Sequence, residues 1–327
     1  MIELDVLLVL AYVLVFPGFI FLFGYSFFAE WFDRKMYAKM QNRVGPPLIQ
    51  PFADFLKLLT KEDITPEKVE KVPYSLLPIL AFAAIATAFV YIPVFVTTTP
   101  IGFQGDLLLV LYMLTLPTIL LFLVGWYSRN IFATIGAYRA VSQLFVYEVP
   151  LFIVALGPAL WAGSWSISDI VSFQQSHYCL FLIQPLGFIV AIMCLQAKLE
   201  RIPFDIPEAE TEIVGGPLVE YSGRKLAMFR ISTDMLMVVG SALIVVLYLG
   251  GPSVGFSLES LHIVVQAIIG FLAFLVKTVF IIFLLSFIRA AFARLRIDQM
   301  TNFGWKWLAS LAFIQIFIII GLRAVMA

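Results

Sequence analysis

The stretch that decides how this chain is organised runs from Glu200 to Glu212 and reads ERIPFDIPEAETE. It places five carboxylates within thirteen residues. The segment directly before it, QPLGFIVAIMCLQA, is typical of a membrane helix, and the apolar pattern returns from about residue 232. A simple connector between two membrane segments does not need so many acids, so this stretch indicates a specific role at the membrane surface.

The composition excludes an ordinary soluble domain. The chain has 327 residues, of which 62% are hydrophobic and 13% are charged, and its mean hydropathy is +1.00. A run of about 18 or more apolar residues can cross a hydrocarbon core about 30 Å thick. Eight candidate spans lie at residues 5–28, 74–96, 107–127, 141–162, 178–197, 232–250, 264–288 and 307–326. We therefore predict an all-α integral membrane protein with eight transmembrane helices in one polytopic domain, residues 1–327.

The distribution of basic residues predicts the topology. Lys and Arg concentrate on the cytoplasmic side of membrane proteins. Here they gather in four segments, residues 29–73, 128–140, 198–231 and 289–306, whereas the intervening loops contain none. We expect these four segments to be cytoplasmic loops and both termini to lie outside.

No redox centre or hydrolytic site is evident in the sequence. The two cysteines, Cys179 and Cys194, form no C-x-x-C pair, and His177 makes no ligand set with them. Phosphate-loop and dinucleotide motifs are absent as well. We expect no cofactor in this chain and no nucleic-acid partner.

The first cytoplasmic segment contains an amphipathic helix. Gly45-Pro46-Pro47 stops the preceding helix, because proline lacks an N–H and clashes with the preceding turn. The stretch PFADFLKLL then places Phe52, Phe55, Leu56 and Leu59 on one helical face. This pattern fits either a lipid-surface anchor or a contact surface for a partner protein.

Glu148 is an ionisable residue inside an apolar span. VPLFIVALGPALW follows it, so it lies at least one turn within the predicted fourth helix. Such a residue costs about 2.5–3.5 kcal/mol on insertion scales and should point toward a partner or water. A static ion pair with Arg139 is the structural alternative, but nine residues separate the two on one helix.

The prolines of the opening stretch prevent one regular helix through it. Pro203 and Pro207 favour an extended or re-entrant path, which survives at membrane depth only when buried in protein or beside water. A helix can start at Pro207, with Glu208 and Glu212 on one face and Glu210 elsewhere. We expect these acids to share protons as a group. The alternative is a solvated acidic loop.

Two more charges occur near or within the apolar spans. Lys277 lies mid-helix in FLAFLVKTVFIIF, and Asp234 lies at the start of the predicted sixth span. Either could pair with an opposite charge inside the bundle. Alternatively, the long Lys277 side chain carries its ammonium to the interface.

Five stretches resemble one protein family. The sequence is similar to the H subunit of NADH-quinone oxidoreductase, the membrane component of complex I that joins the redox arm to the membrane arm. The same family includes the matching component of energy-converting membrane-bound hydrogenases. The stretches are DRKMYAKMQNRVGP (33–46), QPFADFLKLLTKED (50–63), GWYSRNIFATIGAYRAVSQLFVYEVPL (125–151), ERIPFDIPEAETEIVGGPLVEYSG (200–223) and RLRIDQMTNFGWK (294–306).

The resemblance implies roles for individual residues. The cytoplasmic loops would form the seat for the iron–sulfur redox arm and the mouth of an acceptor chamber, and a trail of acids would lead to ion-pumping subunits. The residues expected at the docking surface and mouth are Arg34, Arg43, Asp54, Lys57, Arg139 and Arg201. The residues expected in the proton or ion relay are Glu148, Asp205, Glu208, Glu210, Glu212, Glu220, Asp234 and Lys277.

The resemblance also implies partners. These are peripheral iron–sulfur and large catalytic-type subunits, antiporter-like membrane subunits and the lipid bilayer. Iron–sulfur clusters, and a nickel–iron site in a hydrogenase, would lie in the partner subunits, with this chain in a prokaryotic cytoplasmic membrane. RVGPPLIQP and RKLAMFRISTDM depart from the quinone-reducing pattern. GPLVEYSG together with RVGPP looks more like the hydrogenase and related ferredoxin-driven branch.

The leading functional prediction is therefore a non-catalytic coupling subunit of a ferredoxin-linked hydrogenase or related reductase. The alternative is the quinone-site subunit of an NADH-quinone oxidoreductase. A stand-alone secondary transporter is a third possibility, but such proteins show paired repeats, and the acidic loop has no second copy.

Overall fold

The computed structural model describes residues 9–67, 69–254 and 262–326. Within these residues all regular secondary structure is helical, as the sequence predicts. Seven helical stretches of this described part are long and apolar enough to cross a membrane. They are Val9–Met40, Lys71–Val90, Asp106–Tyr127, Ile131–Ala162, Gly223–Leu249, Ile263–Ala291 and Ile297–Val325.

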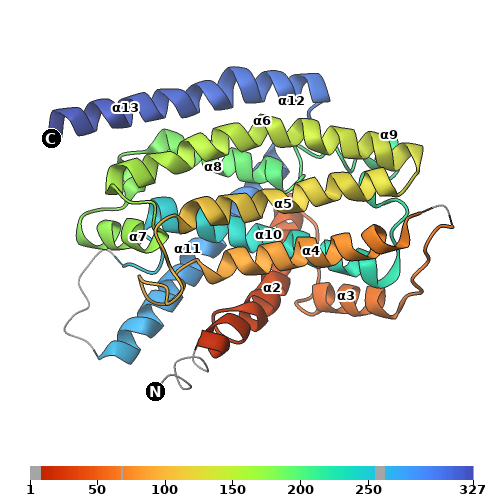
Figure 1. Cartoon of the computed structure of the whole chain (residues 1–327), viewed down its shortest axis with the longest axis horizontal. Coiled ribbons are helices and arrows are strands. Elements are labelled where there is room, and N and C mark those ends of the chain that lie inside the picture. Colours follow the sequence, from red (N-terminus) through yellow and green to blue (C-terminus); the bar gives the residue numbers. More distant parts are fainter. Residues whose placement is uncertain (1–8, 68, 255–261, 327) are drawn as a thin grey trace.

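The long helices pack around one central helix (Figure 1). Helix α10 (Gly223–Leu249) packs against α2 (Phe19–Met40), α4 (Lys71–Val90) and α11 (Ile263–Ala291), and most of its surface is buried. Helices α5 (Asp106–Tyr127) and α6 (Ile131–Ala162) complete the bundle beside α4. By contrast, α11 leaves much of its apolar surface uncovered, as expected for a helix that meets lipid or other subunits.

The fifth predicted span is wrong. In place of residues 178–197 the chain forms α7 (Ile167–Ser176), a 3-10 turn (Leu180–Leu182) and α8 (Pro185–Lys198). Helix α8 has 14 residues, so it is about 21 Å long, which is too short for a hydrocarbon core of about 30 Å. It runs from the α7 end of the bundle into the interior (Figure 1). Pro185 starts α8, so the apolar residues before it pack as a turn and do not extend the helix.

Three other predicted boundaries also move. Most of the predicted loop 128–140 is helix, because α6 starts at Ile131, where Asn130 accepts a hydrogen bond from the Phe132 N–H at 2.8 Å. Helix α10 starts nine residues before the predicted residue 232, at Gly223. The predicted loop 289–306 ends in α12 (Ile297–Phe303), which continues through a wide π-helical segment (Gly304–Ala309) into α13 (Ser310–Met326). Charged residues lie in these terminal helical turns, so a search for apolar runs does not include them.

The amphipathic helix is present as predicted. Helix α3 (Gln50–Thr60) packs against α2 through rings, with Phe55 5.6 Å from both Phe23 and Phe27 between centroids. Phe52 contacts Phe27 at 5.5 Å, and yet 44% of Phe52 remains exposed. Helix α3 thus packs against α2 through its aromatic side chains, and part of its apolar face stays exposed.

The two ends of the bundle differ in content. Helix α3 and the short helix α9 (Glu210–Ile213) lie at one end, whereas α7, the start of α2 and the end of α13 lie at the other (Figure 1). The side of the membrane that each end faces stays a prediction from the positions of Lys and Arg.

Lys277 does not pair with a carboxylate in the described structure, which corrects one sequence hypothesis. Its ammonium donates to the backbone carbonyls of Leu249 at 2.7 Å, Gly251 at 3.0 Å and Ser253 at 2.6 Å. These carbonyls lie at the C-terminal end of α10 and beyond it, where backbone acceptors lack helical partners and the helix dipole favours a cation. Lys277 therefore caps the C-terminal end of α10 in this structure.

A buried amide pair joins α13 to the short helix region. The Gln315 Nε2 donates to Gln184 Oε1 at 3.2 Å, and both side chains are buried. Gly304 in the π-helical segment lies against Val146 of α6, where a Cβ would be 2.0 Å from Val146 Cγ1. These contacts hold the last helix against α6 and α8.

Gly136 allows the acidic loop to lie against α6. A Cβ at this position would be 2.7 Å from Gly216 Cα and from Pro217 Cδ. Gly216 itself has a φ of +58°, and its own Cβ would be 1.9 Å from the Pro207 carbonyl oxygen. Both positions therefore require glycine for close backbone contact.

We expect Gly136→Val to lower the free energy of unfolding by about 1–3 kcal/mol, because the new side chain overpacks against fixed backbone. Gly24→Ala is the matched control: a Cβ at Gly24 meets nothing within 4 Å, and alanine favours the helix. Thermal unfolding of both variants in detergent measures the difference. Equal melting temperatures would contradict the packing argument.

Candidate functional site

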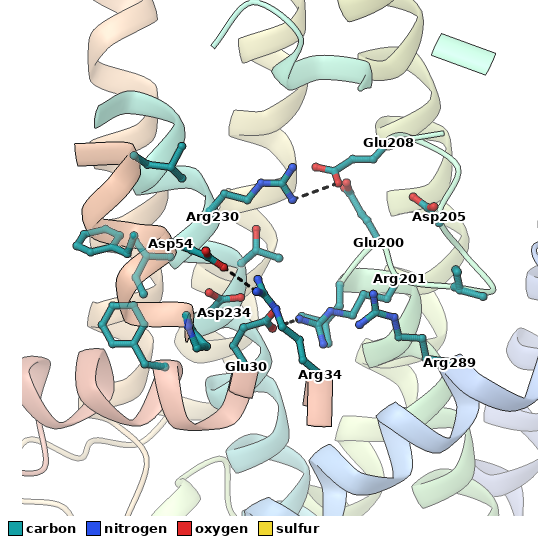
Figure 2. Close-up of a pocket in the computed structure, with 18 of the residues that line it drawn as sticks. Glu30, Arg34, Asp54, Glu200, Arg201, Asp205, Glu208, Arg230, Asp234 and Arg289 are labelled. Carbon is teal, nitrogen blue, oxygen red and sulfur yellow. Dashed lines mark hydrogen bonds and ion pairs between the residues drawn. The ribbon is translucent and has the colours of Figure 1, made fainter. Parts of the chain in front are cut away.

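A charged cavity of about 610 Å³ opens among α2, α3, α10, α11 and the loop after α8 (Figure 2). One wall is apolar, formed by side chains that include Phe27, Phe55 and Leu58. The remaining walls carry acids and arginines from both halves of the chain. The charged lining residues are Glu30, Arg34, Asp54, Glu200, Arg201, Asp205, Glu208, Arg230, Asp234, Arg289 and Arg294.

Arg201 ties the loop to α2. Its guanidinium pairs with Glu30 at 2.7 Å and with Asp33 at 2.8 Å, and only 12% of its side chain is exposed. Asp33 also pairs with Arg289 of α11 at 2.8 Å and accepts a hydrogen bond from Ser286 Oγ at 2.7 Å. Because ion pairs in a low-dielectric interior need such compensation, this network fixes three elements together.

Arg34 joins α2 to α3. It pairs with Glu30 at 2.6 Å and with Asp54 at 2.9 Å. Gln50 donates a second hydrogen bond to Asp54 at 2.9 Å. The two arginines therefore share the Glu30 carboxylate, and α3 is coupled to the loop through that one acid.

Two further charges face this network across the cavity (Figure 2). Asp234 of α10 lies close enough to interact with Glu30 and Arg201. Arg230, one turn earlier on α10, is 3.7 Å from Glu208. Helix α10 therefore forms one charged wall of the cavity.

Glu200 adopts an unusual backbone conformation at the deep end of the loop. Its φ of +52° lies in the left-handed region, which favours glycine. The turn directs the side chain into the cavity wall, beside Glu208 and Asp205. Burial raises the pKa of the Glu200 carboxyl well above its usual range, and the negative charges of Glu208 and Asp205 raise it further. The surroundings of Glu200 therefore favour its protonated form.

A second, smaller cavity of about 70 Å³ shares lining residues with the first. Glu200, Glu208 and Arg230 line both cavities. The smaller one is also lined by Lys198 and by Thr118 of α5. A space of this size has room for about two waters.

Glu148 lies behind this smaller cavity. Its carboxylate accepts from Lys198 Nζ at 2.8 and 3.2 Å, and both side chains are buried. The Lys198 ammonium also lies 5.2 Å from the centre of the Tyr147 ring. Tyr147 in turn is 2.9 Å from Thr118 between hydroxyl oxygens. Polar groups thus connect the loop acids to α6, and the partner of Glu148 is Lys198, not Arg139.

Six predicted site residues meet in the larger cavity, and Glu148 lies behind it. The six are Arg34, Asp54, Arg201, Asp205, Glu208 and Asp234. The side chain of Glu210 lies outside the described part of the chain. Arg43 and Lys57 are exposed and do not line the cavity.

Other predicted residues lie at the surface. Glu212 pairs with Arg139 at 2.5 Å and with Arg294 at 3.6 Å, and the Arg139 hydrogen bond lowers the pKa of Glu212. Glu220 accepts a hydrogen bond from Asn130 Nδ2 at 2.5 Å, away from the cavity. The expected shared face of Glu208 and Glu212 is wrong, because α9 starts only at Glu210.

Sequence reasoning missed several groups of the site. Glu30 and Asp33 precede Arg34 on the charged end of α2, and Glu30, Asp33, Arg34 and Tyr37 share one helical face. That spacing was a readable signal. Lys198 and Arg289 gave no such signal, since both read as ordinary positive charges at the end of an apolar helix.

No group of three or more His, Cys, Asp or Glu residues in the described ranges is arranged to hold a metal ion. Hydrogen bonds and ion pairs hold the charged groups that line the two cavities.

Comparisons with known proteins identify the family of the chain. The model of the family described as NADH dehydrogenase matches residues 11–320. The chain belongs to this family. The H subunit of NADH-quinone oxidoreductase from Carboxydothermus hydrogenoformans is 36% identical over 304 residues, covering 91% of this chain and 85% of that protein. The same protein of Brevibacillus brevis is 39% identical over 302 residues, covering 90% and 87%.

A solved structure has the same fold. It is a chain of the membrane-bound sulfane sulfur reductase, titled an archaeal respiratory membrane complex, with a TM-score of 0.82 and 30% identity. The match covers 92% of this chain and 96% of that chain. The resemblance drawn from the five stretches is thus confirmed at the level of the family. The names of the relatives favour the quinone-reductase alternative over the hydrogenase prediction.

The raised pKa of Glu200 predicts a pH-dependent stability. At Glu200 the folded state binds more protons than the unfolded state above about pH 4.3, the usual pKa of a glutamate. Stability therefore falls as pH rises from that value toward the raised pKa of folded Glu200. Glu200→Gln resembles the protonated form and should flatten this slope. Melting temperatures from pH 4 to pH 8, in detergent, measure it, and parallel curves would contradict the assignment.

Proposed function

We propose that this chain is the coupling subunit of a membrane-bound respiratory oxidoreductase, and that it relays protons from its charged cavity to ion-pumping membrane subunits. The redox centres would lie in partner subunits that dock on the end of the bundle with α3 and α9. Family membership and the names of the relatives support the assignment to a respiratory complex.

The observation that carries the relay is that the two cavities share charged lining residues. Acids of the loop line the larger one, two of them line the smaller one as well, and Lys198 joins the smaller one to Glu148. A chain of titratable side chains and water spaces can pass protons over short steps. A solvated acidic loop, the alternative, would not place Glu200 and Glu208 in the lining of both cavities.

The proposed sequence begins with electron transfer at the mouth of the cavity. A change of charge there alters the protonation of Asp205, Glu208 and Glu200, which interact strongly with one another. That change reaches Glu148 through the smaller cavity. Glu148 then passes it laterally to neighbouring antiporter-like subunits in the cytoplasmic membrane.

A quinone is the acceptor that the names of the relatives favour. The cavity has the apolar wall needed for a quinone ring, beside Phe27 and Phe55, and arginines opposite. A small polar acceptor in a ferredoxin-linked complex is the second candidate. The similarity to a sulfane sulfur reductase chain and the mainly charged lining support it. A quinone-site inhibitor that blocks membrane activity would favour the first.

We expect Glu148→Gln and Asp205→Asn to abolish ion movement driven by electron transfer, because each removes a proton-carrying carboxylate from the relay. Glu212→Gln is the matched control from the same loop, since Glu212 is half exposed and lines neither cavity. Ion uptake into inverted membrane vesicles, measured during turnover, tests all three.

Wild-type ion uptake in the assembled Glu148→Gln complex would overturn the relay. Loss of uptake in Glu212→Gln alone would instead place the path along the protein surface.

A further inference from the structure

Helix α8 ends inside the bundle and places one positive charge, that of Lys198, beside the proposed relay. Lys198 is the last residue of α8, and 1% of its side chain is exposed. A buried ammonium is costly unless it is paired. Here Glu148, the Tyr147 ring and the C-terminal end of α8 all stabilise it.

Lys198 lies between two sets of acids. On one side its ammonium contacts Glu148. On the other side Lys198 lines the smaller cavity together with Glu200 and Glu208. The titratable and charged groups around it from every neighbouring element are Glu148 and Tyr147 of α6, Cys194 of α8, Glu200 and Glu208 of the loop, and Arg230 of α10.

Hydrogen bonds on both sides of Lys198 hold its backbone in place. The carbonyl of Ala197 accepts a hydrogen bond from Gln143 Nε2 at 2.6 Å, and Gln196 Nε2 donates to the Ile202 carbonyl at 2.6 Å. A lysine side chain has a four-carbon stem that can rotate about a fixed backbone. The ammonium can therefore change partners without movement of α8.

We propose that Lys198 is a mobile charge that moves between Glu148 and the Glu200–Glu208 pair, and that this movement transmits the protonation state of the loop acids to Glu148. The inference rests on the proposed function and assigns a positioning residue to the same relay.

The exchange is balanced in charge and in protons. In the first state Glu200 is protonated, Glu148 is ionised and Lys198 pairs with Glu148. The Glu200 proton then moves through water in the smaller cavity to Glu148, and the ammonium moves the opposite way to the new Glu200 carboxylate. The three groups together carry zero net charge in both states, so the low-dielectric interior holds no unpaired charge.

The test uses the whole complex in liposomes and measures electron transfer and ion uptake separately. Lys198→Met should leave electron transfer in place and remove most of the ion uptake, because Glu148 and the loop acids lose the cation that they share. Lys225→Met is the matched control, because Lys225 also pairs with a carboxylate (Asp63, 3.4 Å) and lies over a tyrosine ring (Tyr74, 4.9 Å), outside the relay. Lys225→Met should keep wild-type uptake per electron.

A second variant separates movement from static pairing and still decides if Lys198→Met fails to assemble. Lys198→Arg keeps the charge and the pair, but its planar guanidinium binds a carboxylate through two hydrogen bonds. We expect Lys198→Arg to keep Glu148 ionised during turnover and to reduce uptake. The infrared carboxyl band of Glu148, identified as the band that Glu148→Gln removes, reports its protonation.

Full uptake in Lys198→Arg, or in an assembled Lys198→Met complex, would overturn the mobile charge. If Glu148→Gln abolishes uptake in the same assay, only the role of Lys198 fails. If Glu148→Gln also pumps normally, the relay itself fails.

Discussion

Helix α8 ends inside the bundle, and the backbone that follows it can stay there only because protein groups satisfy its polar atoms. Gln143 and Gln196 cover carbonyls on either side of the helix end. Arg201 then carries the chain to the acids of α2. Tyr74 donates from its hydroxyl to the Glu220 carbonyl at 2.8 Å, where the loop reaches the end of the bundle. The cavities exist because this stretch is loop and not helix.

The charges of the site differ in how firmly they are held. Arg201 and Asp33 each have two or more charged partners at 2.8 Å or less, and removal of one partner from such a buried pair costs about 3–5 kcal/mol. Glu208 has a looser contact at 3.7 Å. Rigid pairs thus form the frame on the α2 and α11 side, whereas Glu208 is held less firmly.

The sequence predicted the membrane class, the family and the acids of the loop, since apolar runs and a proline-rich acidic motif are local signals. It also placed Glu148 inside the bundle with a partner. The identity of that partner could not be predicted, because Lys198 is 50 residues away in the sequence. In addition, a search for apolar runs does not show that α8 ends inside the bundle at Lys198. The fifth predicted span, residues 178–197, was wrong for the same reason. Lys277 shows a further limit: the pattern indicates a buried cation but not whether carboxylates or carbonyls receive it.

The π-helical segment Gly304–Ala309 contains one residue more than the same length of α-helix would need. Each residue of an α-helix turns the chain by about 100°, so everything beyond the segment owes its orientation to that extra residue. A shortening by one position there would swing Gln315 off its contact with Gln184 toward the surrounding bilayer. If a related chain had one residue fewer in this segment, a different side of its last helix would therefore face the bundle.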